Sequence, residues 1–536
     1  MKTRLKEKDK LLHQSFDWIL SDPDYLRWQD GTDVCLLWIK GGAGKGKTMM
    51  SIGLIEELSQ RPKGSNTVLY FFCQNANYEL NTVESIIKGL ILQLIQQQKE
   101  LAQSLRDRWD VASQRFTEDV TSWRGLWDIL MEILDRCSCA CVYVIVDALD
   151  ECDGNGMAGL LRTLVRTGLC RHSPIKWLVT SRPLDSAEME LLSGSEQVLV
   201  SLELNAEHIS RGVTAYIAHK VGELDRRHKY RAKLRQAIQT ELEAKAEDTF
   251  LWVSLVCKQL EQVGRHQALS TIQSLPPGLH PFYDRILHQI SKGEPDDVNN
   301  CMRLLTSMTL TYRPLNILEV SNVAGLPAEE YVVEDLVDRC ASFVKLRGAE
   351  IEFVHQSARD YLTGDQGQAI LSSHDTYEHG DIARNCLSHI SKHLTKNLLG
   401  LPQPNSTRDT LGALGGDAAR ELLSSLGYAA TFWARHFHTI QDTRIVQDTI
   451  IKDGLVDQFL RTKFLEWLEC LSLLDQLPQV IEALSILSEV FYHRAPVSSR
   501  FCVPWFCLAD SLSWFGSRIR HQLLSKTPHV LFNDII

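Results

Sequence analysis

The hydrophobic positions in the first 200 residues form short continuous runs that alternate with stretches of helical periodicity. Between the runs, apolar residues recur at helical spacing, and residues 81–84 have the pattern of a capping box before a helix that reaches about residue 95. Alternating strands and helices predict a parallel α/β domain of three layers. The five runs of strand length are residues 34–39, 67–73, 141–146, 175–180 and 197–202.

The rest of the chain has a mostly helical pattern. Residues 205–265 carry helical apolar faces, and a proline-rich break follows at 274–279. Three helices and a hairpin that turns at 347–349 then have the order of a winged helix, and residues 316–319 are expected to cap the second of these helices. We expect five parts: an N-terminal helical lead-in (1–33), the α/β domain (34–204), a helical domain (205–297), a winged-helix domain (298–365) and a C-terminal helical region (366–536).

A glycine-rich loop lies between the first predicted strand and the helix after it. The segment GGAGKGKT fits the P-loop pattern G-x4-G-K-[ST] in one register, which starts at Gly41 and ends at Lys47 and Thr48. The alternative register, through Lys45, would need a glycine at Ile39 and a hydroxyl at position 46. The sequence therefore predicts that a nucleoside triphosphate binds here, unless this is a chance glycine-rich turn.

The register gives each residue of the loop an expected role. Lys47 should reach the β- and γ-phosphates, and the Thr48 hydroxyl should bind Mg²⁺. Backbone N–H groups and the positive end of the following helix should surround the phosphates. Lys45 is expected to point outward or to touch phosphate only through its backbone. The candidate nucleotide-binding residues are Gly41, Gly42, Ala43, Gly44, Lys45, Gly46, Lys47, Thr48 and Met49.

An acidic cluster follows the predicted strand at 141–146. Asp147 comes directly after this apolar run, where a carboxylate can hold the Mg²⁺ that bridges the phosphates. Asp150 and Glu151 are both candidates to orient and polarise the attacking water, and their spacing does not choose between them. Alone, the cluster would be read as an acidic loop after a core strand, but beside a P-loop it predicts hydrolysis.

One arginine lies at the end of the predicted strand at 175–180. Arg182 follows Ser181 directly, so its guanidinium could contact the γ-phosphate. The alternative is an ordinary surface arginine.

The segments LLWIKGGAGKGKT, YFFCQ, VDALDEC and TSRP together resemble fungal NACHT proteins related to vegetative incompatibility proteins. The small residue Ala148 after Asp147 is part of this resemblance. The usual fungal loop is closer to GDPGKGKT, so Gly42 and Ala43 replace an aspartate and a proline. Both residues are small, so phosphate binding should persist in a less rigid loop.

The resemblance covers residues 10–365 well and implies a nucleotide-dependent signalling switch of the STAND class. Its closed form would hold the diphosphate, and its triphosphate form would open and self-associate. In this family a histidine of the winged helix contacts the β-phosphate in the closed state, and FVHQSARDYL nominates His355. The alternative is a histidine that caps a helix in the domain core. The resemblance further implies slow hydrolysis and a role in incompatibility, innate immunity or programmed cell death.

The net charge and the composition limit the kinds of partner that the chain is expected to bind. The net charge is −10, and residues 299–365 hold six Lys and Arg against ten Asp and Glu, a net of −4. This charge argues against a phosphate-backbone partner, so we expect no nucleic acid at the winged helix. No apolar run approaches the roughly 20 residues that span a bilayer. The cysteines are not set at zinc spacing, and the alternation of Cys137, Cys139 and Cys141 suits one face of a strand better than a metal site. Reduced thiols are the simplest interpretation, so we expect a cytoplasmic protein.

Two other functions stay open. The chain could be a P-loop ATPase that turns over steadily, or a scaffold that binds nucleotide without hydrolysis. The guanine signature NKxD is absent, which favours ATP, whereas the resemblance includes GTP binders, so we expect ATP or GTP with Mg²⁺ as cofactor. No repeat is evident and the first 33 residues are short for an effector, so effector and sensor partners are expected in trans, unless this is a bare switch or a truncated gene product.

Overall fold

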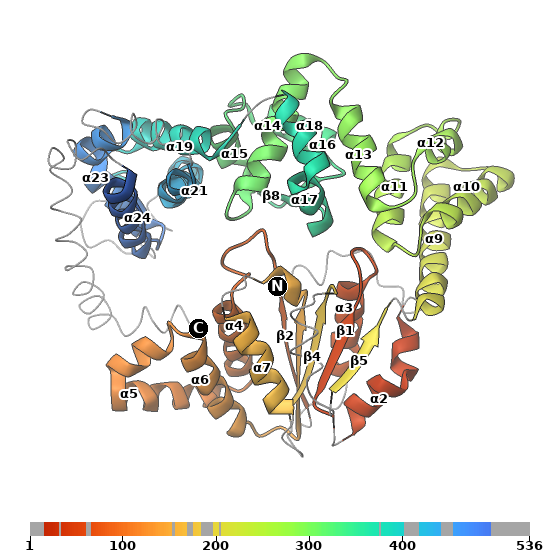
Figure 1. Cartoon of the computed structure of the whole chain (residues 1–536), viewed down its shortest axis with the longest axis horizontal. Coiled ribbons are helices and arrows are strands. Elements are labelled where there is room, and N and C mark those ends of the chain that lie inside the picture. Colours follow the sequence, from red (N-terminus) through yellow and green to blue (C-terminus); the bar gives the residue numbers. More distant parts are fainter. Residues whose placement is uncertain are drawn as a thin grey trace. The chain divides into compact units, whose positions relative to one another are not determined.

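The structure is a computed structural model, and it falls into two compact units that are described separately. Residues Met1–Arg285 belong to the first unit and Ile286–Asn533 to the second (Figure 1). The structure describes residues 16–31, 34–60, 66–152, 156–168, 175–183, 197–202, 205–374, 377–400, 417–440 and 454–494.

The first unit contains a five-stranded parallel sheet, with the strands in the order β2-β3-β4-β1-β5. All five strands predicted from the apolar runs are confirmed. Residues of β3 and β4 are buried almost without exception, as expected for strands covered on both faces. The strands are β1 (Leu36–Lys40), β2 (Asn66–Phe72), β3 (Cys141–Asp147), β4 (Ile175–Ser181) and β5 (Gln197–Ser201).

This strand order places β4 between β1 and β3. Leu36 of β1 pairs with Trp177 of β4, and Val142 of β3 pairs with Ile175 on the other edge of β4. In a parallel sheet the carboxyl ends of neighbouring strands meet at one edge. The end of β4 therefore lies between the glycine-rich loop after β1 and the acidic cluster after β3.

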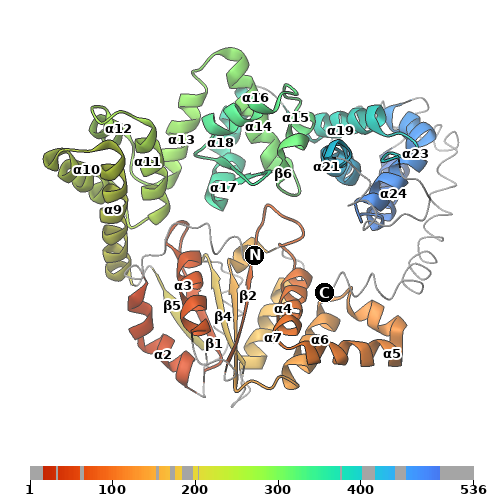
Figure 2. The same ribbon diagram turned by 180° about the vertical axis from the view of Figure 1, so that it is seen from behind.

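Helices cover both faces of the sheet. Helix α3 packs on β2, β3 and β4, whereas α7 packs on β1 and β4. The two views in Figures 1 and 2 show α7 and α3 on opposite sides of the strands, which is the predicted three-layer arrangement. The helices around the sheet are α2 (Pro23–Asp30), α3 (Lys47–Ser59), α4 (Val83–Gln97), α5 (Ala102–Asp119), α6 (Trp123–Asp135) and α7 (Met157–Gly168).

A short N-terminal segment packs against the sheet, with α2 in contact with β5 and β1. The ring of Trp28, on α2, lies 5.5 Å from that of Tyr143 on β3. The ammonium of Lys176 donates a hydrogen bond of 2.8 Å to the carbonyl of Val34. The described part of the predicted lead-in is therefore helical and is packed onto the α/β domain.

Helices follow the sheet, as the apolar pattern predicted. Helix α11 is held by a buried face that includes Trp252, whose indole N–H donates to the carbonyl of Pro276 at 3.1 Å. The division between the two units falls within α13, inside the predicted helical domain. These helices are α9 (Ala206–His228), α10 (Ala232–Lys245), α11 (Phe250–Gln262), α12 (Ala268–Ser274) and α13 (Leu279–Ile290).

The second unit begins with helices and a small antiparallel sheet in the order β6-β8-β7. The predicted hairpin is confirmed, with β7 (Val344–Arg347) and β8 (Glu350–Phe353) joined at Gly348, which has a φ of 60°. The predicted cap at Asn316 is also confirmed as a capping box with Glu319. The other elements here are α14 (Pro295–Leu310), β6 (Leu315–Asn316), α15 (Ile317–Ala324), α16 (Glu330–Arg339), α17 (Gln356–Thr363) and α18 (Asp365–His374).

The described C-terminal part is helical, as predicted. Trp433 and Trp467 are fully buried, and their rings lie 5.8 Å apart at the centre of the packing. Within the described residues, no helix is both long and apolar enough to cross a membrane. The helices are α19 (His379–His393), α21 (Asp417–Thr439), α23 (Leu455–Leu473) and α24 (Pro478–Arg494).

Two local predictions were wrong. The cap of α4 is Thr82, whose hydroxyl accepts the N–H of Ser85 at 3.1 Å, so the cap lies one residue later than the 81–84 pattern suggested. Cys137 and Cys139 were assigned to a strand face, but β3 begins only at Cys141. The Cys139 thiol instead contacts the Thr67 hydroxyl at 2.7 Å.

Candidate functional site

The first glycine of the loop lies where a side chain would not fit. The Gly41 N–H donates to the carbonyl of Ser181 on β4 at 3.1 Å. A Cβ at position 41 would lie 2.8 Å from the Leu202 Cδ1 atom, beside the end of β5. The loop therefore starts from a backbone that is fixed between two neighbouring strands.

The later glycines allow the loop to reverse direction. Gly44 has a φ of 72°, and Gly46, which precedes the first residue of α3, has a φ of 94°. Other residues rarely adopt these values. Residues 42–49 are partly exposed, and Thr48 and Met49 lie in the first turn of α3. The first four N–H groups of a helix lack partners within it, so this half-open turn is suited to an anion.

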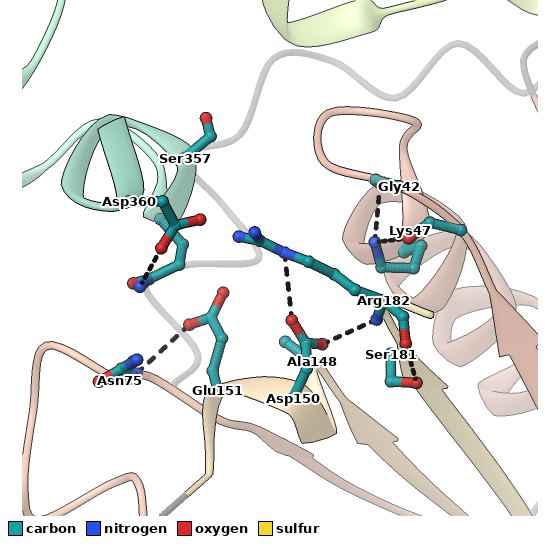
Figure 3. A network of polar contacts seen from close by, with 12 residues as sticks. Gly42, Lys47, Asn75, Ala148, Asp150, Glu151, Ser181, Arg182, Ser357 and Asp360 are labelled. Carbon is teal, nitrogen blue, oxygen red and sulfur yellow. Dashed lines mark hydrogen bonds and ion pairs between the residues drawn. The ribbon is translucent and has the colours of Figure 1, made fainter. Parts of the chain in front are cut away.

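The two lysines of the loop point to different partners. The Lys47 ammonium donates to the carbonyls of Gly41 and Gly42, the latter at 2.9 Å, so it lies over the loop itself (Figure 3). The Lys45 ammonium donates at 2.9 Å to the carbonyl of Glu247, in the turn between α10 and α11. The Lys45 side chain is therefore directed at this turn, and the expectation that it does not contact phosphate stays a prediction.

Asp147 lies at the end of β3 and is 2% exposed. One of its oxygens, Oδ1, accepts the hydroxyl of Ser51 on α3 at 2.7 Å and the hydroxyl of Thr180 on β4 at 2.8 Å. Ser51 is one helical turn after Lys47, so this pair of bonds fixes α3 relative to the acidic cluster. Two hydroxyl groups of the protein therefore donate to the same oxygen of Asp147.

The chain turns sharply at Ala148, which has the left-handed φ and ψ values of 56° and 51°. Its N–H donates to the Thr180 hydroxyl at 2.9 Å, so Thr180 both accepts from Ala148 and donates to Asp147. A non-glycine residue in this conformation is strained, and such strain is common where a site requires a fixed direction. The turn sends the 149–151 segment (η4) along the sheet edge.

Asp150 and Arg182 form a two-point contact. The Arg182 N–H donates to Oδ1 of Asp150 at 3.0 Å, and its Nε lies 3.2 Å from Oδ2 (Figure 3). The Asp150 side chain is 8% exposed and that of Arg182 is 27% exposed. Asp150 thus orients the arginine at the end of β4, which is a more specific place than an ordinary surface arginine would have.

Glu151 has a different environment from its neighbour. Its Oε2 accepts a long hydrogen bond of 3.4 Å from the N–H of Asn75, just after β2. Burial, followed by the negative charge of Asp150, raises the pKa of Glu151 from its usual 4.5 to about 7. A carboxyl group with a pKa near neutrality can take and return a proton. The geometry therefore separates two residues that sequence spacing left equivalent.

The donor set next to the loop is of the kind that Mg²⁺ uses. Mg²⁺ in nucleotide sites takes one or two carboxylates or hydroxyls, substrate phosphates and water. Asp147 and Thr48 supply one carboxylate and one hydroxyl, and the rest would come from the nucleotide and solvent. In the part of the chain that the structure describes, no cluster of three metal-ligating residues suggests a different, all-protein metal site.

His355 belongs to the second unit and caps a helix there. It is the residue before α17, and its Nδ1 accepts the N–H of Ser357 at 3.0 Å. This is the capping role that the sequence offered as the alternative to a phosphate contact. A cap uses one ring nitrogen, so the phosphate contact implied by the resemblance stays a prediction.

Sequence reasoning missed Ser51, Thr180 and Asn75. The first two are polar residues on otherwise buried faces of α3 and β4, a signal that could have marked them. The partner of Asn75 depends on which strand ends lie side by side, and no local pattern contains that information.

The comparisons with known proteins agree with the motifs. A family model described as "Nephrocystin 3, N-terminal" matches residues 14–182. The vegetative incompatibility protein HET-E-1 of Podospora anserina is 33% identical over 511 residues. Both matches indicate that the chain is similar to fungal NACHT proteins. The alignment covers 91% of this chain but 37% of the length of HET-E-1, so this chain corresponds to part of that relative.

Among solved structures, this chain is similar to a Walker-type ATPase of Pyrococcus abyssi, with 13% identity and a TM-score of 0.32. That match covers 66% of this chain and 97% of the other. Cdc6p from Pyrobaculum aerophilum matches with 11% identity, a TM-score of 0.29 and coverage of 70% and 98%. Both likenesses are too distant to assign a role to any residue.

Proposed function

We propose that this chain is a nucleotide-dependent signalling switch that binds ATP or GTP with Mg²⁺ and hydrolyses it slowly. One observation carries the proposal. A glycine loop of P-loop spacing, the carboxylate Asp147 and the Arg182–Asp150 pair lie at the same edge of one parallel sheet, together with a glutamate whose pKa is about 7. These are the groups that binding and cleavage of a triphosphate require.

Binding would use the loop and the start of α3. The backbone N–H groups of residues 42–49 would surround the phosphates, with Gly41 as the fixed start of the loop. Lys47 would exchange its two carbonyl partners in the loop for the β- and γ-phosphates. Thr48 and Asp147 would hold the Mg²⁺, which supplies positive charge to the phosphates when it is bound.

Hydrolysis would be supported by Glu151 and Arg182. The Glu151 carboxylate would accept a proton from the attacking water, because a base with a pKa near 7 is half ionised at neutral pH. Asp150 would hold the Arg182 guanidinium toward the γ-phosphate, where positive charge stabilises the transition state. We therefore assign the general base to Glu151 and the positioning of the arginine to Asp150.

The resemblance to fungal incompatibility proteins supports a switch rather than a motor. In this proposal the diphosphate form is closed, the triphosphate form self-associates, and effector or sensor partners act in trans in the cytoplasm. The name of the HET-E-1 relative supports a role in incompatibility. A role in innate immunity or programmed cell death rests on the resemblance alone. The elements from α14 to β8 would form the winged helix, and His355 would contact the β-phosphate in the closed state.

The assignment of the phosphate lysine can be tested with matched variants. Lys47→Ala should weaken nucleotide binding by about 100-fold or more, because it removes the charge closest to the phosphates. Lys45→Ala changes the same charge two residues away and should change the affinity by less than about tenfold, roughly 1.4 kcal/mol. Isothermal titration with ADP, ATP, GDP and GTP measures both and identifies the base. The opposite ranking of the two lysines would refute the assigned register.

The switch itself can be tested by turnover and by the bound nucleotide. The purified protein should carry tightly held ADP or GDP, identified by mass spectrometry. Its hydrolysis should be slow, on the order of 10⁻⁴ to 10⁻² per second, as in signalling GTPases. Many turnovers per second by the isolated monomer would instead indicate a motor, and binding without any hydrolysis would indicate a scaffold.

The proposed role of His355 in the closed state can be tested by substitution. His355→Ala should speed nucleotide exchange, and unchanged exchange would leave His355 with its capping role alone.

A further inference from the structure

The turn between α10 and α11 lies directly against the glycine loop, within the first unit. A Cβ at Gly44 would be 2.9 Å from Thr249 Cγ2 and 3.0 Å from Leu251 Cβ, and a Cβ at Gly46 would be 3.1 Å from the Phe250 ring. Contacts this close mean that two glycines of the loop are also sites of packing. The loop and the turn are therefore packed closely against each other.

The backbone of this turn is strained. Glu247 and Asp248 are consecutive non-glycine residues with φ values of 46° and 54°. Left-handed conformations are unfavourable for residues with a Cβ, so such a pair persists only when other contacts hold it. The carbonyl of Glu247 receives two of these contacts, from the Lys45 ammonium at 2.9 Å and from the Thr249 hydroxyl at 3.0 Å.

The helices on either side of the turn are tied together. The Lys245 ammonium, at the end of α10, donates to the carbonyls of Ile272, Gln273 and Leu275 at 2.8–2.9 Å, which joins it to the end of α12. The Trp252 indole, in α11, reaches the carbonyl of Pro276 in the same segment. A movement of the turn would thus also involve α10, α11 and α12.

Lys45 is the side chain through which the loop holds this group of helices. The loop's other lysine, Lys47, is turned inward onto the carbonyls of Gly41 and Gly42. The two lysines therefore have different partners. Lys47 lies over the loop itself, and Lys45 bonds the backbone of the turn.

We propose that Lys45 is a positioning residue, which holds the α10–α11 turn against the glycine loop and so slows the release of nucleotide. This inference rests on the proposed nucleotide site, and it adds that the second lysine of the loop controls how long the nucleotide stays. When Lys45 is absent, the strained turn loses one of the two donors to the Glu247 carbonyl and moves away from the loop more often.

Two readouts on the full chain test the proposal. In Lys45→Ala, the backbone amides of residues 246–251 should exchange with deuterium about three- to tenfold faster, even without nucleotide. Release of a fluorescent ADP or GDP analogue should speed up by a similar factor. Lys45→Arg keeps a charged donor and should restore both. Lys88→Ala, which removes an exposed lysine from α4, is the matched control and should change neither.

A second variant leaves the residues of the glycine loop unchanged. Thr249→Val keeps the shape of the side chain and removes the other donor to the Glu247 carbonyl, so exchange at residues 246–251 should again rise while the glycine loop is unaltered. Unchanged exchange in both Lys45→Ala and Thr249→Val would overturn the proposal. It would also be overturned if Lys45→Ala weakened nucleotide association without altering exchange in the turn, because Lys45 would then act on the phosphates directly.

The exchange measurement separates this inference from the proposed function. Nucleotide-free protein should show faster exchange in Lys45→Ala whether or not the site binds nucleotide. If Lys47→Ala bound nucleotide as well as the unaltered chain, the proposed site would fail while the role of Lys45 in the turn could still hold.

Discussion

Two glutamates in this molecule have opposite surroundings. Glu319, 2% exposed in the second unit, accepts two hydrogen bonds of 2.7 and 2.8 Å from the guanidinium of Arg313. It also accepts the N–H groups of Asn316 and Tyr428, at 2.8 and 2.7 Å. Glu151, at the sheet edge of the first unit, has a long bond from one N–H and a carboxylate neighbour in Asp150.

The comparison distinguishes a glutamate that holds two helices together from one that is suited to proton transfer. Four hydrogen bonds occupy both oxygens of Glu319, and together they join α15 to α21. Around Glu151, burial and the Asp150 charge oppose ionisation, so the pKa rises to about 7. A carboxyl group with such a raised pKa can exchange a proton near neutral pH.

The largest effect is expected from Glu151→Gln, measured by single-turnover hydrolysis. The amide cannot accept a proton, so the rate should fall by about 10²–10⁴-fold while nucleotide affinity stays nearly constant. In the unaltered chain the rate should rise with pH to a plateau above about 7, since only the ionised carboxylate acts. Asp150→Asn removes the neighbouring charge and should move this midpoint downward. A rate unaffected by Glu151→Gln would remove Glu151 from the chemistry.

The second largest effect is expected from substitution of Glu319. Glu319→Ala should lower the free energy of unfolding by about 3–5 kcal/mol, because it leaves Arg313 and two buried N–H groups without their acceptor. Chemical denaturation followed by fluorescence measures this loss. Arg384→Ala, which breaks an exposed pair with Asp381 on α19, should cost less than about 1 kcal/mol. Equal losses in the two variants would contradict the distinction.

The smallest of the three effects concerns stability and pH. In the folded chain Glu151 binds its proton more tightly than in the unfolded chain, with a pKa of about 7 against 4.5. Ionisation therefore costs stability as pH rises from 4.5 to 7. Glu151→Gln removes this cost and should raise the free energy of unfolding at pH 8 by about 3 kcal/mol, but not at pH 4. Thermal unfolding of nucleotide-free protein at both pH values checks it, and an equal change at both would contradict the shifted pKa.

Local patterns were sufficient for the elements and for part of the site. Apolar runs identified the five strands, and the spacing from Gly41 to Thr48 separated Lys47 from Lys45. The residue types at 316–319, with an asparagine three residues before a glutamate, identified the cap at Asn316. The α4 cap was displaced by one residue because Asn81 and Thr82 are both good caps, and only tertiary packing chooses between them.

The remainder of the site depends on contacts between distant segments. Asp147 meets Ser51 and Thr180 because β4 lies between β1 and β3, and the order of strands is not contained in any local pattern. The separation of Asp150 from Glu151 likewise required the position of Arg182. The partner of Lys45 lies 202 residues further along the chain.

The strand order also has a consequence for how the protein is made. The two neighbours of β1 are β4 and β5, so the backbone at the start of the glycine loop is fixed by the bond of Gly41 to Ser181 and that of Lys40 to Leu202. The ribosome synthesises the loop early, but at about 5–20 residues per second these partners follow roughly 8–30 s later. During that interval the apolar strand before the loop has no sheet to join. A nascent chain would need to be shielded from aggregation until a nucleotide could stabilise it.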